Sequence, residues 1–269
     1  MHFWVTVQLS LAVLGMTPEQ KARVMVVTTE RPGVFYGAAG IRFADQEGGL
    51  VKAFPADPPS RAAGDAATER EAFADGAATR RALRRQGVDL DLAPVLDAPD
   101  GPLGSRQFRR GALGVAFARG LGPTACPKHF PGLGTAAHST DERPHVDAHV
   151  RPRDLAPFRA AIRAGVRCVM VGHAFYGTRF RASLEPSTYR RLRALGFDGV
   201  AITDSLSIVH DAPVERWARQ AARAGADMLL FTSPAHAERA VQALRPLARR
   251  GELDEHVLRV LRLHAGVRR

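Results

Sequence analysis

The second half of the chain alternates between short apolar segments and longer amphipathic ones. The short segments are typical of buried strands, and the longer ones repeat apolar residues at helical spacing. The predicted strands are 167–173, 199–203 and 227–231, and the predicted helices are 154–164, 186–195, 214–224, 235–249 and 253–265. Strands that alternate with helices indicate a parallel sheet, and this many units in one domain favour a barrel over an open sheet. The sequence therefore predicts an α/β fold of the (β/α)8 TIM-barrel type.

The first part of the chain departs from this pattern. Segments 33–37 and 41–44 both read as strands, but only Ala38, Ala39 and Gly40 separate them. A parallel crossover needs about a dozen residues or more, so the first strand-helix unit is shortened and the barrel is predicted to be incomplete or irregular. The two strands should be antiparallel, non-adjacent or not both present. An exposed sheet edge there would favour self-association.

Length and composition fit one domain, 1–269, with residues 1–40 as an atypical N-terminal segment. The 269 residues are 45% hydrophobic, and a single barrel of this type commonly uses about 250 residues. The formal charge of +11 comes almost entirely from arginine, which recurs at helical spacing in Arg216, Arg219 and Arg223. Such spacing is typical of solvated helix faces, so no nucleic-acid partner is expected. Binding of another anionic polymer is an alternative that only the charge supports.

The cysteines and the N-terminus bear on cellular location. Cys126 and Cys168 lie in expected core strands, where a free cysteine behaves as a small apolar residue, so we expect no disulfide and a reducing compartment. Segment 2–16 is apolar but too short to span a bilayer, and it lacks the basic start and cleavage site of a signal peptide. We therefore expect a packed element and a cytoplasmic protein without membrane contact, with a degenerate export signal as the alternative.

Polar residues follow several of the predicted strands. Lys128 and His129 come after the apolar segment 124–126, Asp45 follows 41–44, and Asp204 follows the strand 199–203. The carboxyl ends of parallel strands open into one shared mouth in α/β proteins. These side chains are therefore expected to converge on one ligand site.

Four motifs occur in a fixed order between about residue 44 and residue 231. They are Asp45-Gln46-Glu47-Gly48-Gly49, Ala93-Pro94-Val95-Leu96-Asp97, the loop Lys128-His129-Phe130-Pro131-Gly132-Leu133-Gly134, and Thr203-Asp204-Ser205-Leu206-Ser207. Together they resemble the catalytic domain of glycoside hydrolase family 3, in particular the bacterial β-N-acetylhexosaminidases that trim cell-wall amino sugars. The resemblance implies a retaining glycosidase that releases terminal β-linked N-acetylhexosamine from a carbohydrate substrate without a cofactor.

The resemblance also implies roles for single residues. Asp204 matches the nucleophile of the family, although an aspartate after a strand could also be a helix N-cap. Glu47 is expected to support the Gly48-Gly49 turn, and His173 is expected either to contact the sugar or to pack in the core. The other predicted sugar contacts are Asp45, Arg106, Lys128 and His129.

The general acid is where the chain differs from the family pattern. Its relatives carry an Asp-x-His pair on the loop after the Lys128 motif, and this chain has no such pair. A plain alignment places Asp141 opposite the family histidine, whereas His138 has the more suitable unperturbed pKa. We expect His138 rather than Asp141 to be the acid. The alternative for Asp141 is that it only tethers the loop, with Arg143 as the candidate partner. A catalytically impaired, sugar-binding relative is therefore the alternative function.

No metal or nucleotide motif is recognisable. The histidines show neither a His-Glu-x-x-His run nor a Cys/His ligand spacing. The pair Gly132 and Gly134 lacks the third glycine and the following helix of a dinucleotide-binding loop. No metal and no cofactor are expected.

Overall fold

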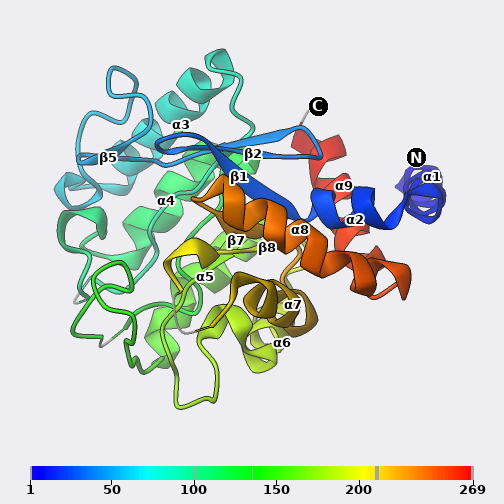
Figure 1. Ribbon diagram of the computed structural model, residues 1–269. Helices are drawn as coiled ribbons and strands as arrows, with labels where there is room; N and C mark the ends of the chain where they lie inside the picture. Colours follow the sequence, from blue (N-terminus) through cyan, green and yellow to red (C-terminus); the bar gives the residue numbers. More distant parts are fainter. Residues whose placement is uncertain (1, 100, 135, 210–211, 268–269) are drawn as a thin grey trace.

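The computed structural model describes residues 2–99, 101–134, 136–209 and 212–267. Strands lie at the centre and helices lie around them (Figure 1). The largest sheet in the described part of the chain has the strand order β6-β3-β2-β1-β9. In two smaller sheets, β4 (Gln46–Gly48) pairs with β5 (Val51–Lys52), and β7 pairs with β8. The other strands are β1 (Val26–Arg31), β2 (Val34–Gly37), β3 (Ile41–Ala44), β6 (Leu90–Asp91), β7 (Cys168–Val171), β8 (Val200–Thr203) and β9 (Leu229–Phe231).

The five-stranded sheet and the β7-β8 sheet are linked by single bridges and do not form one closed sheet. Parallel bridges join Asp91 to Ala125, Val95 to Lys128, Phe130 to Val171, and Ile202 to Met228. Segment 125–130 therefore joins its neighbours only through isolated bridges. Thr124, which was predicted to begin a strand, lies instead in a short 3-10 helix, Gly122–Thr124. The predicted α/β class is confirmed, whereas regular pairing throughout a barrel is not observed.

β2 runs opposite to the strands on both of its sides. It pairs antiparallel with β1 and with β3, whereas β1 pairs parallel with β9 and β3 pairs parallel with β6. Short turns can join only antiparallel neighbours, so the prediction from the spacing of residues 37–41 is confirmed. The predicted free edge is wrong, because β2 is hydrogen-bonded on both sides. The argument for self-association from an open edge is therefore removed.

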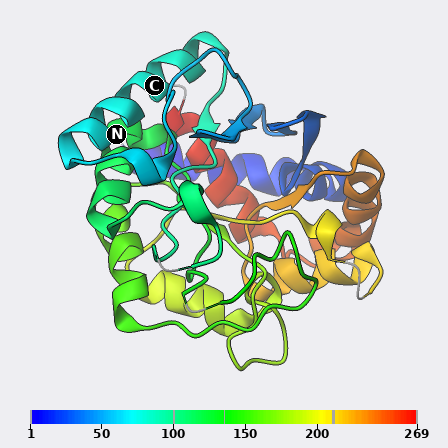
Figure 2. The same cartoon turned by 90° about the vertical axis from the view of Figure 1, so that its left-hand side faces the viewer.

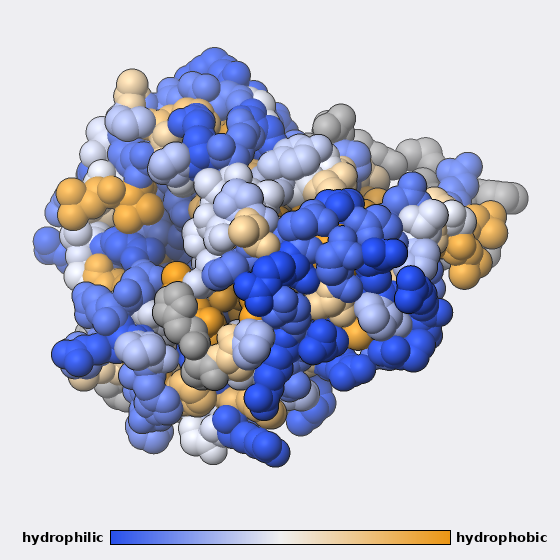
Figure 3. Space-filling view, in the orientation of Figure 1, coloured by the Kyte–Doolittle hydropathy of each residue, from blue (hydrophilic) through white to orange (hydrophobic). Residues whose placement is uncertain are grey.

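Helices cover the outside of the strands. Their bounds are α2 (Pro18–Val24), α3 (Glu69–Arg85), α4 (Gly111–Leu121), α5 (Pro152–Arg163), α6 (Pro186–Ala194), α7 (Val214–Ala224) and α8 (Pro234–Arg249). α3 begins after Thr68, which forms a capping box with Glu71. Gly87 follows its end with φ +68°, a conformation that favours glycine. Hydrophilic side chains gather over α8 (Figure 3).

The apolar N-terminal segment forms the helix α1 (His2–Gly15), which packs on the C-terminal helix α9 (Asp254–Val267). Val13 is buried, while Leu11 and Leu14 are exposed. The described part of this helix therefore packs against α9 through one face and leaves apolar side chains exposed on the other. None of the helices in the described part of the chain is long and apolar enough to cross a bilayer.

Cys126 and Cys168 form a disulfide, which contradicts the predicted free thiols. Their Cα atoms lie 4.5 Å apart on neighbouring segments, since Phe130 bridges to β7 just beyond them. Sequence patterns place both residues in strands but do not show that the strands are adjacent. The inference of a reducing compartment therefore loses its basis.

Candidate active site

A cavity of about 290 Å³ lies at the carboxyl ends of the parallel strands. Figure 2 looks onto this end of the molecule, where loops rather than helices fill the centre. The polar residues that line the cavity are Asp45, Glu47, Arg106, Lys128, His129, Asp141, Asp204, Ser205 and Thr232. Apolar walls come from Phe35, Val51, Met170, Ile208 and Leu230. The expected convergence of Asp45, Arg106, Lys128, His129 and Asp204 is thus observed.

A larger hollow of about 410 Å³ lies at the opposite end of the strands, near the turn between β2 and β3. Its lining includes Arg42, Arg84 and a single carboxylate residue, Asp89. The Asp89 carboxylate accepts a hydrogen bond from the backbone N–H of Arg42. This hollow therefore lacks the clustered acids and bases of the first cavity, which we take as the candidate site.

Asp204 follows β8 directly, and its backbone N–H donates to the carbonyl of Val171 on β7. Its Oδ1 accepts a hydrogen bond of 2.7 Å from the N–H of Ser205. Burial alone would raise the pKa of Asp204, but the charges of His173, His129 and Lys128 hold this pKa below its usual value. The carboxylate is therefore ionised at neutral pH.

Lys128 is buried and holds two carboxylates. Its Nζ lies 2.7 Å from Oδ1 of Asp45 and 2.6 Å from Oε1 of Glu47. Burial lowers the pKa of Lys128, but Asp45 and Glu47 raise it above its ordinary value. The ammonium group therefore stays charged inside the cavity wall.

Glu47 belongs to the site, and the predicted role in the Gly48-Gly49 turn is wrong. Its carboxylate accepts two hydrogen bonds of 2.8 Å from Arg106, in addition to the ion pair with Lys128. Burial opposes ionisation, but these two cations lower the pKa of Glu47 to about 2. The period of a strand places residues 45 and 47 on one face, and that signal could have identified Glu47 together with Asp45.

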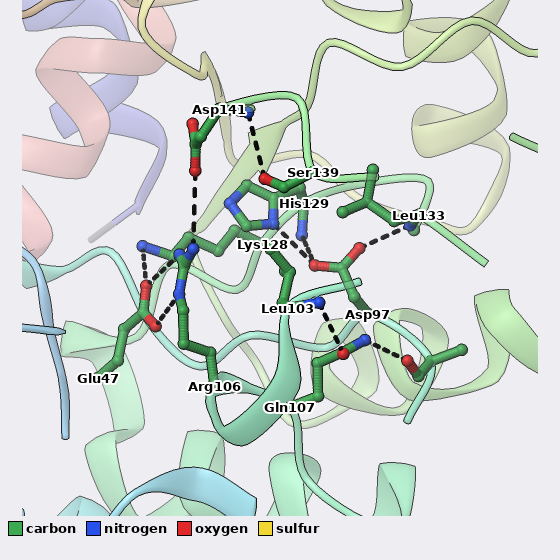
Figure 4. A network of polar contacts seen from close by, with 12 residues as sticks. Glu47, Asp97, Leu103, Arg106, Gln107, Lys128, His129, Leu133, Ser139 and Asp141 are labelled. Carbon is green, nitrogen blue, oxygen red and sulfur yellow. Dashed lines mark hydrogen bonds and ion pairs between the residues drawn. The ribbon is translucent and has the colours of Figure 1, made fainter. Parts of the chain in front are cut away.

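Asp97 is a second residue that the sequence analysis did not assign. Its Oδ2 accepts from the backbone N–H of His129 at 3.1 Å and lies 2.7 Å from Nδ1 of the same residue. Its Oδ1 accepts from the N–H of Leu133 at 2.6 Å. Burial lowers the pKa of His129, but Asp97 raises it above its usual value. Asp97 therefore orients His129 and the loop that follows it (Figure 4).

His173 packs behind the site and does not line the cavity. Its Nε2 lies 3.0 Å from the carbonyl oxygen of Ser205 and its Nδ1 lies 2.7 Å from Oγ of Ser183. A carbonyl can only accept, so Nε2 donates, whereas the Ser183 hydroxyl can donate to Nδ1 or accept from it. Burial lowers the pKa of His173 below its usual value. The geometry supports the packing role and corrects the expected sugar contact.

The two acid candidates occupy different places. Asp141 lines the cavity, and its Oδ2 lies 3.7 Å from Nη1 of Arg106. His138 is not among the lining residues; its half-exposed ring lies 3.9 Å from Glu142. The preference for His138 is therefore not supported, and the tether of Asp141 is Arg106 rather than Arg143.

No group of three or more histidine, cysteine, aspartate or glutamate side chains suited to a metal ion occurs in residues 2–99, 101–134, 136–209 and 212–267. The side chains that line the site carry carboxylate, ammonium, guanidinium, imidazole and hydroxyl groups. An ionised aspartate at a strand end, facing clustered donors in a cavity, is the arrangement found in enzymes of the α/β-barrel class.

The comparisons with known proteins agree with this class. Residues 23–263 match the glycosyl hydrolase family 3 N-terminal domain. A β-hexosaminidase of Stenotrophomonas maltophilia is 33% identical over 239 residues, which cover 75% of this chain and 69% of that protein. A β-hexosaminidase of Vibrio cholerae is 36% identical over 212 residues, which cover 70% of this chain and 64% of that protein.

Among solved structures, the β-N-acetylhexosaminidase of Beutenbergia cavernae superposes with a TM-score of 0.74 at 28% identity, covering 82% of this chain and 77% of that one. The chain belongs to glycosyl hydrolase family 3. The alignments span roughly two thirds of the length of the two sequence relatives.

Proposed function

We propose that the protein is a retaining glycoside hydrolase that releases terminal β-linked N-acetylhexosamine, with Asp204 as nucleophile. The observation that carries the proposal is the ionised Asp204 carboxylate in a cavity that it shares with Lys128 and His129. A nucleophilic carboxylate must be unprotonated and close to hydrogen-bond donors that hold the sugar. The small cavity suits one terminal sugar residue better than an extended chain.

The reaction has two steps. One oxygen of Asp204 attacks the anomeric carbon while the bond to the leaving oxygen breaks, and this oxygen takes a proton from the general acid. Water then attacks the covalent intermediate, returns a proton to the general base and frees Asp204. Sugar hydroxyl and acetamido groups are bound by Asp45, Arg106, Lys128 and His129, whose side chains supply acceptors and donors.

We assign the acid/base role to Asp141. Unlike His138, this residue lines the cavity, and pairs of carboxylates serve the two roles in most retaining glycosidases. Its carboxylate lies on the same cavity wall as Arg106. Protonated Asp141 would donate to the leaving oxygen on the side of the sugar away from Asp204.

A catalytically impaired sugar-binding protein is the second candidate. The Asp141 side chain is 58% exposed, and this chain lacks the Asp-x-His pair that its relatives carry on this loop. The sugar-binding residues would be retained in such a protein.

One assay separates the two candidates. The folded protein is incubated with nitrophenyl N-acetyl-β-glucosaminide, and the first sugar released is observed by NMR. A retaining enzyme gives the β anomer first. Release of the α anomer first would exclude the Asp204 nucleophile, and calorimetric binding of N-acetylglucosamine without turnover would favour the impaired relative.

A further inference from the structure

Five charged residues form a continuous chain along one wall of the cavity, and Figure 4 shows four of them, Lys128, Glu47, Arg106 and Asp141. Starting from β3, they alternate in sign through Asp45, Lys128, Glu47, Arg106 and Asp141. The links are 2.7 Å, 2.6 Å, 2.8 Å and 3.7 Å long in this order. Glu47 is the central member, and the proposed function assigns it no role.

Burial is deepest in the middle of this chain and decreases toward both ends, since the Asp45 side chain is 25% exposed. The side chains of Glu47 and Lys128 are 2% and 3% exposed, that of Arg106 is 22% exposed, and that of Asp141 is 58% exposed. Glu47 grips Arg106 through both carboxylate oxygens, a geometry that fixes the direction of the guanidinium plane. The contact of Arg106 with Asp141 is longer and more open to water. An isolated pair of that kind contributes little, so this contact depends on a guanidinium group that Glu47 already holds in place.

The loop that carries Asp141 is anchored near its two ends, where Ala136, Val146 and Ala148 are buried and residues 146 and 148 share backbone hydrogen bonds with Phe175. Residues 141–145, between these anchors, are exposed. Between Leu133 and Pro152 the described residues contain neither a helix nor a named strand. Within the loop, the N–H of Asp141 bonds to Oγ of Ser139, and Asp147 forms a single bridge to Phe175. Arg106 is the one residue outside the loop for which the described part of the chain shows an ion pair with Asp141.

We propose that Glu47 is a positioning residue that, through Arg106, holds the loop and the Asp141 carboxylate at the cavity. Glu47 fixes the orientation of the guanidinium group of Arg106. Its negative charge also partly neutralises Arg106, so the attraction between Arg106 and Asp141 is weaker than that of an isolated pair. This inference rests on the proposed function, in which Asp141 transfers the proton. In this inference, Glu47 links the ends of the strands to the loop that carries Asp141, between Leu133 and Pro152.

The test is Glu47→Gln, which keeps the shape of the side chain and removes its charge. A misplaced acid matters most when the leaving group is poor, so kcat for a natural disaccharide should fall about tenfold more than kcat for the activated nitrophenyl glycoside. KM should rise for both substrates, because Lys128 loses a partner. A uniform loss on the two substrates would overturn the proposal.

Two further variants keep the test decisive. Glu215→Gln is the matched control, because Glu215 binds Arg239 with the same two-pronged geometry on the outer helices, and it should change neither kcat. Arg106→Lys keeps the positive charge but not the fork, and it should reproduce the selective loss on the disaccharide. If Glu47→Gln does not fold, the Arg106→Lys result decides.

Hydrogen exchange separates this inference from the proposed function. Amides of residues 136–146 should exchange faster in Glu47→Gln and Arg106→Lys than in the wild type, and Glu215→Gln should match the wild type. If the wild type hydrolyses neither glycoside, the proposed function fails, and the exchange result still decides the tether. Unchanged exchange in both site variants would overturn the inference.

Discussion

The two ends of the strands each hold an aspartate, Asp227 fully buried and Asp204 partly exposed, and the two residues are used differently. Asp227, at the amino end of β9, accepts from Arg193 at 2.6 Å and from the N–H of Ala201 at 2.9 Å through Oδ2. Its Oδ1 lies 2.9 Å from Nδ1 of His256 and accepts from Arg259 at 3.1 Å. Asp204, at the carboxyl end of β8, accepts one short bond from Ser205 and faces a cavity.

Both carboxyl groups have a pKa below the usual value in spite of burial. The pKa of Asp227 is lowered because both of its carboxylate oxygens accept hydrogen bonds, from groups on α6, β8 and α9. In Asp204 the lowered pKa results from nearby charges that leave the carboxylate free to react. A lowered pKa therefore identifies a site only when an oxygen of the group also remains accessible to a ligand.

The largest expected effect is that of Asp204→Asn. The variant should lose activity by about a thousandfold or more, because an amide cannot form the covalent intermediate. Its melting temperature should stay close to that of the wild type, since no oxygen of Asp204 ties distant elements together. Kinetics on the nitrophenyl glycoside and a thermal melt test this, and near-normal turnover would exclude Asp204 as nucleophile.

The next effect compares Asp141→Ala with His138→Ala. Loss of a general acid costs about 10²- to 10⁴-fold, and the loss should be larger for a disaccharide than for a nitrophenyl glycoside. We expect this selectivity in Asp141→Ala only. If His138→Ala shows it instead, the loop must rearrange to bring His138 into the cavity when substrate binds.

Asp227→Asn should have the opposite profile to Asp204→Asn. Removing one charge from a buried ion cluster costs about 3–5 kcal/mol of unfolding free energy, while kcat per folded molecule should be unchanged. The folded-state pKa of Asp227 is lowered, so its stabilisation is complete above the unfolded value near 4 and is lost as pH falls through the folded value. Urea unfolding at neutral and acidic pH should show the difference shrinking in acid.

The smallest effect is that of Asp91→Asn. Burial raises the pKa of Asp91 well above its usual value, its Oδ1 accepts from the N–H of Gln46, and its Oδ2 has no partner in the described structure. A raised carboxyl pKa opposes folding as pH rises through the folded value. The variant should therefore be more stable than the wild type at pH 7, with no gain near pH 4. Equal stability of the two proteins at both pH values would contradict this.

Much of the second half of the fold was predictable, because strands such as β8 and helices such as α7 carry strong periodic patterns. The antiparallel β2 also followed from the sequence, since three residues cannot make a crossover. The disulfide was not predictable, because pairing of Cys126 with Cys168 depends on which segments are neighbours.

The site was predictable where residues follow strands, as for Asp45 and Lys128. Glu47 required the side-chain alternation to be followed one step further along the strand. His173 was ambiguous, because a histidine at a strand end can face either the cavity or the core, and only hydrogen-bond partners distinguish the two. The distance of His138 from the cavity reflects the course of an irregular loop, which no periodic pattern encodes.

The Cys126–Cys168 disulfide closes a covalent ring around the segment that contains Lys128, His129 and the acid loop. A protease that cuts this loop once would leave both fragments joined. The cut protein would run as one species on a gel without reductant and as two with it, so loop cleavage could be followed while the rest of the domain stays folded.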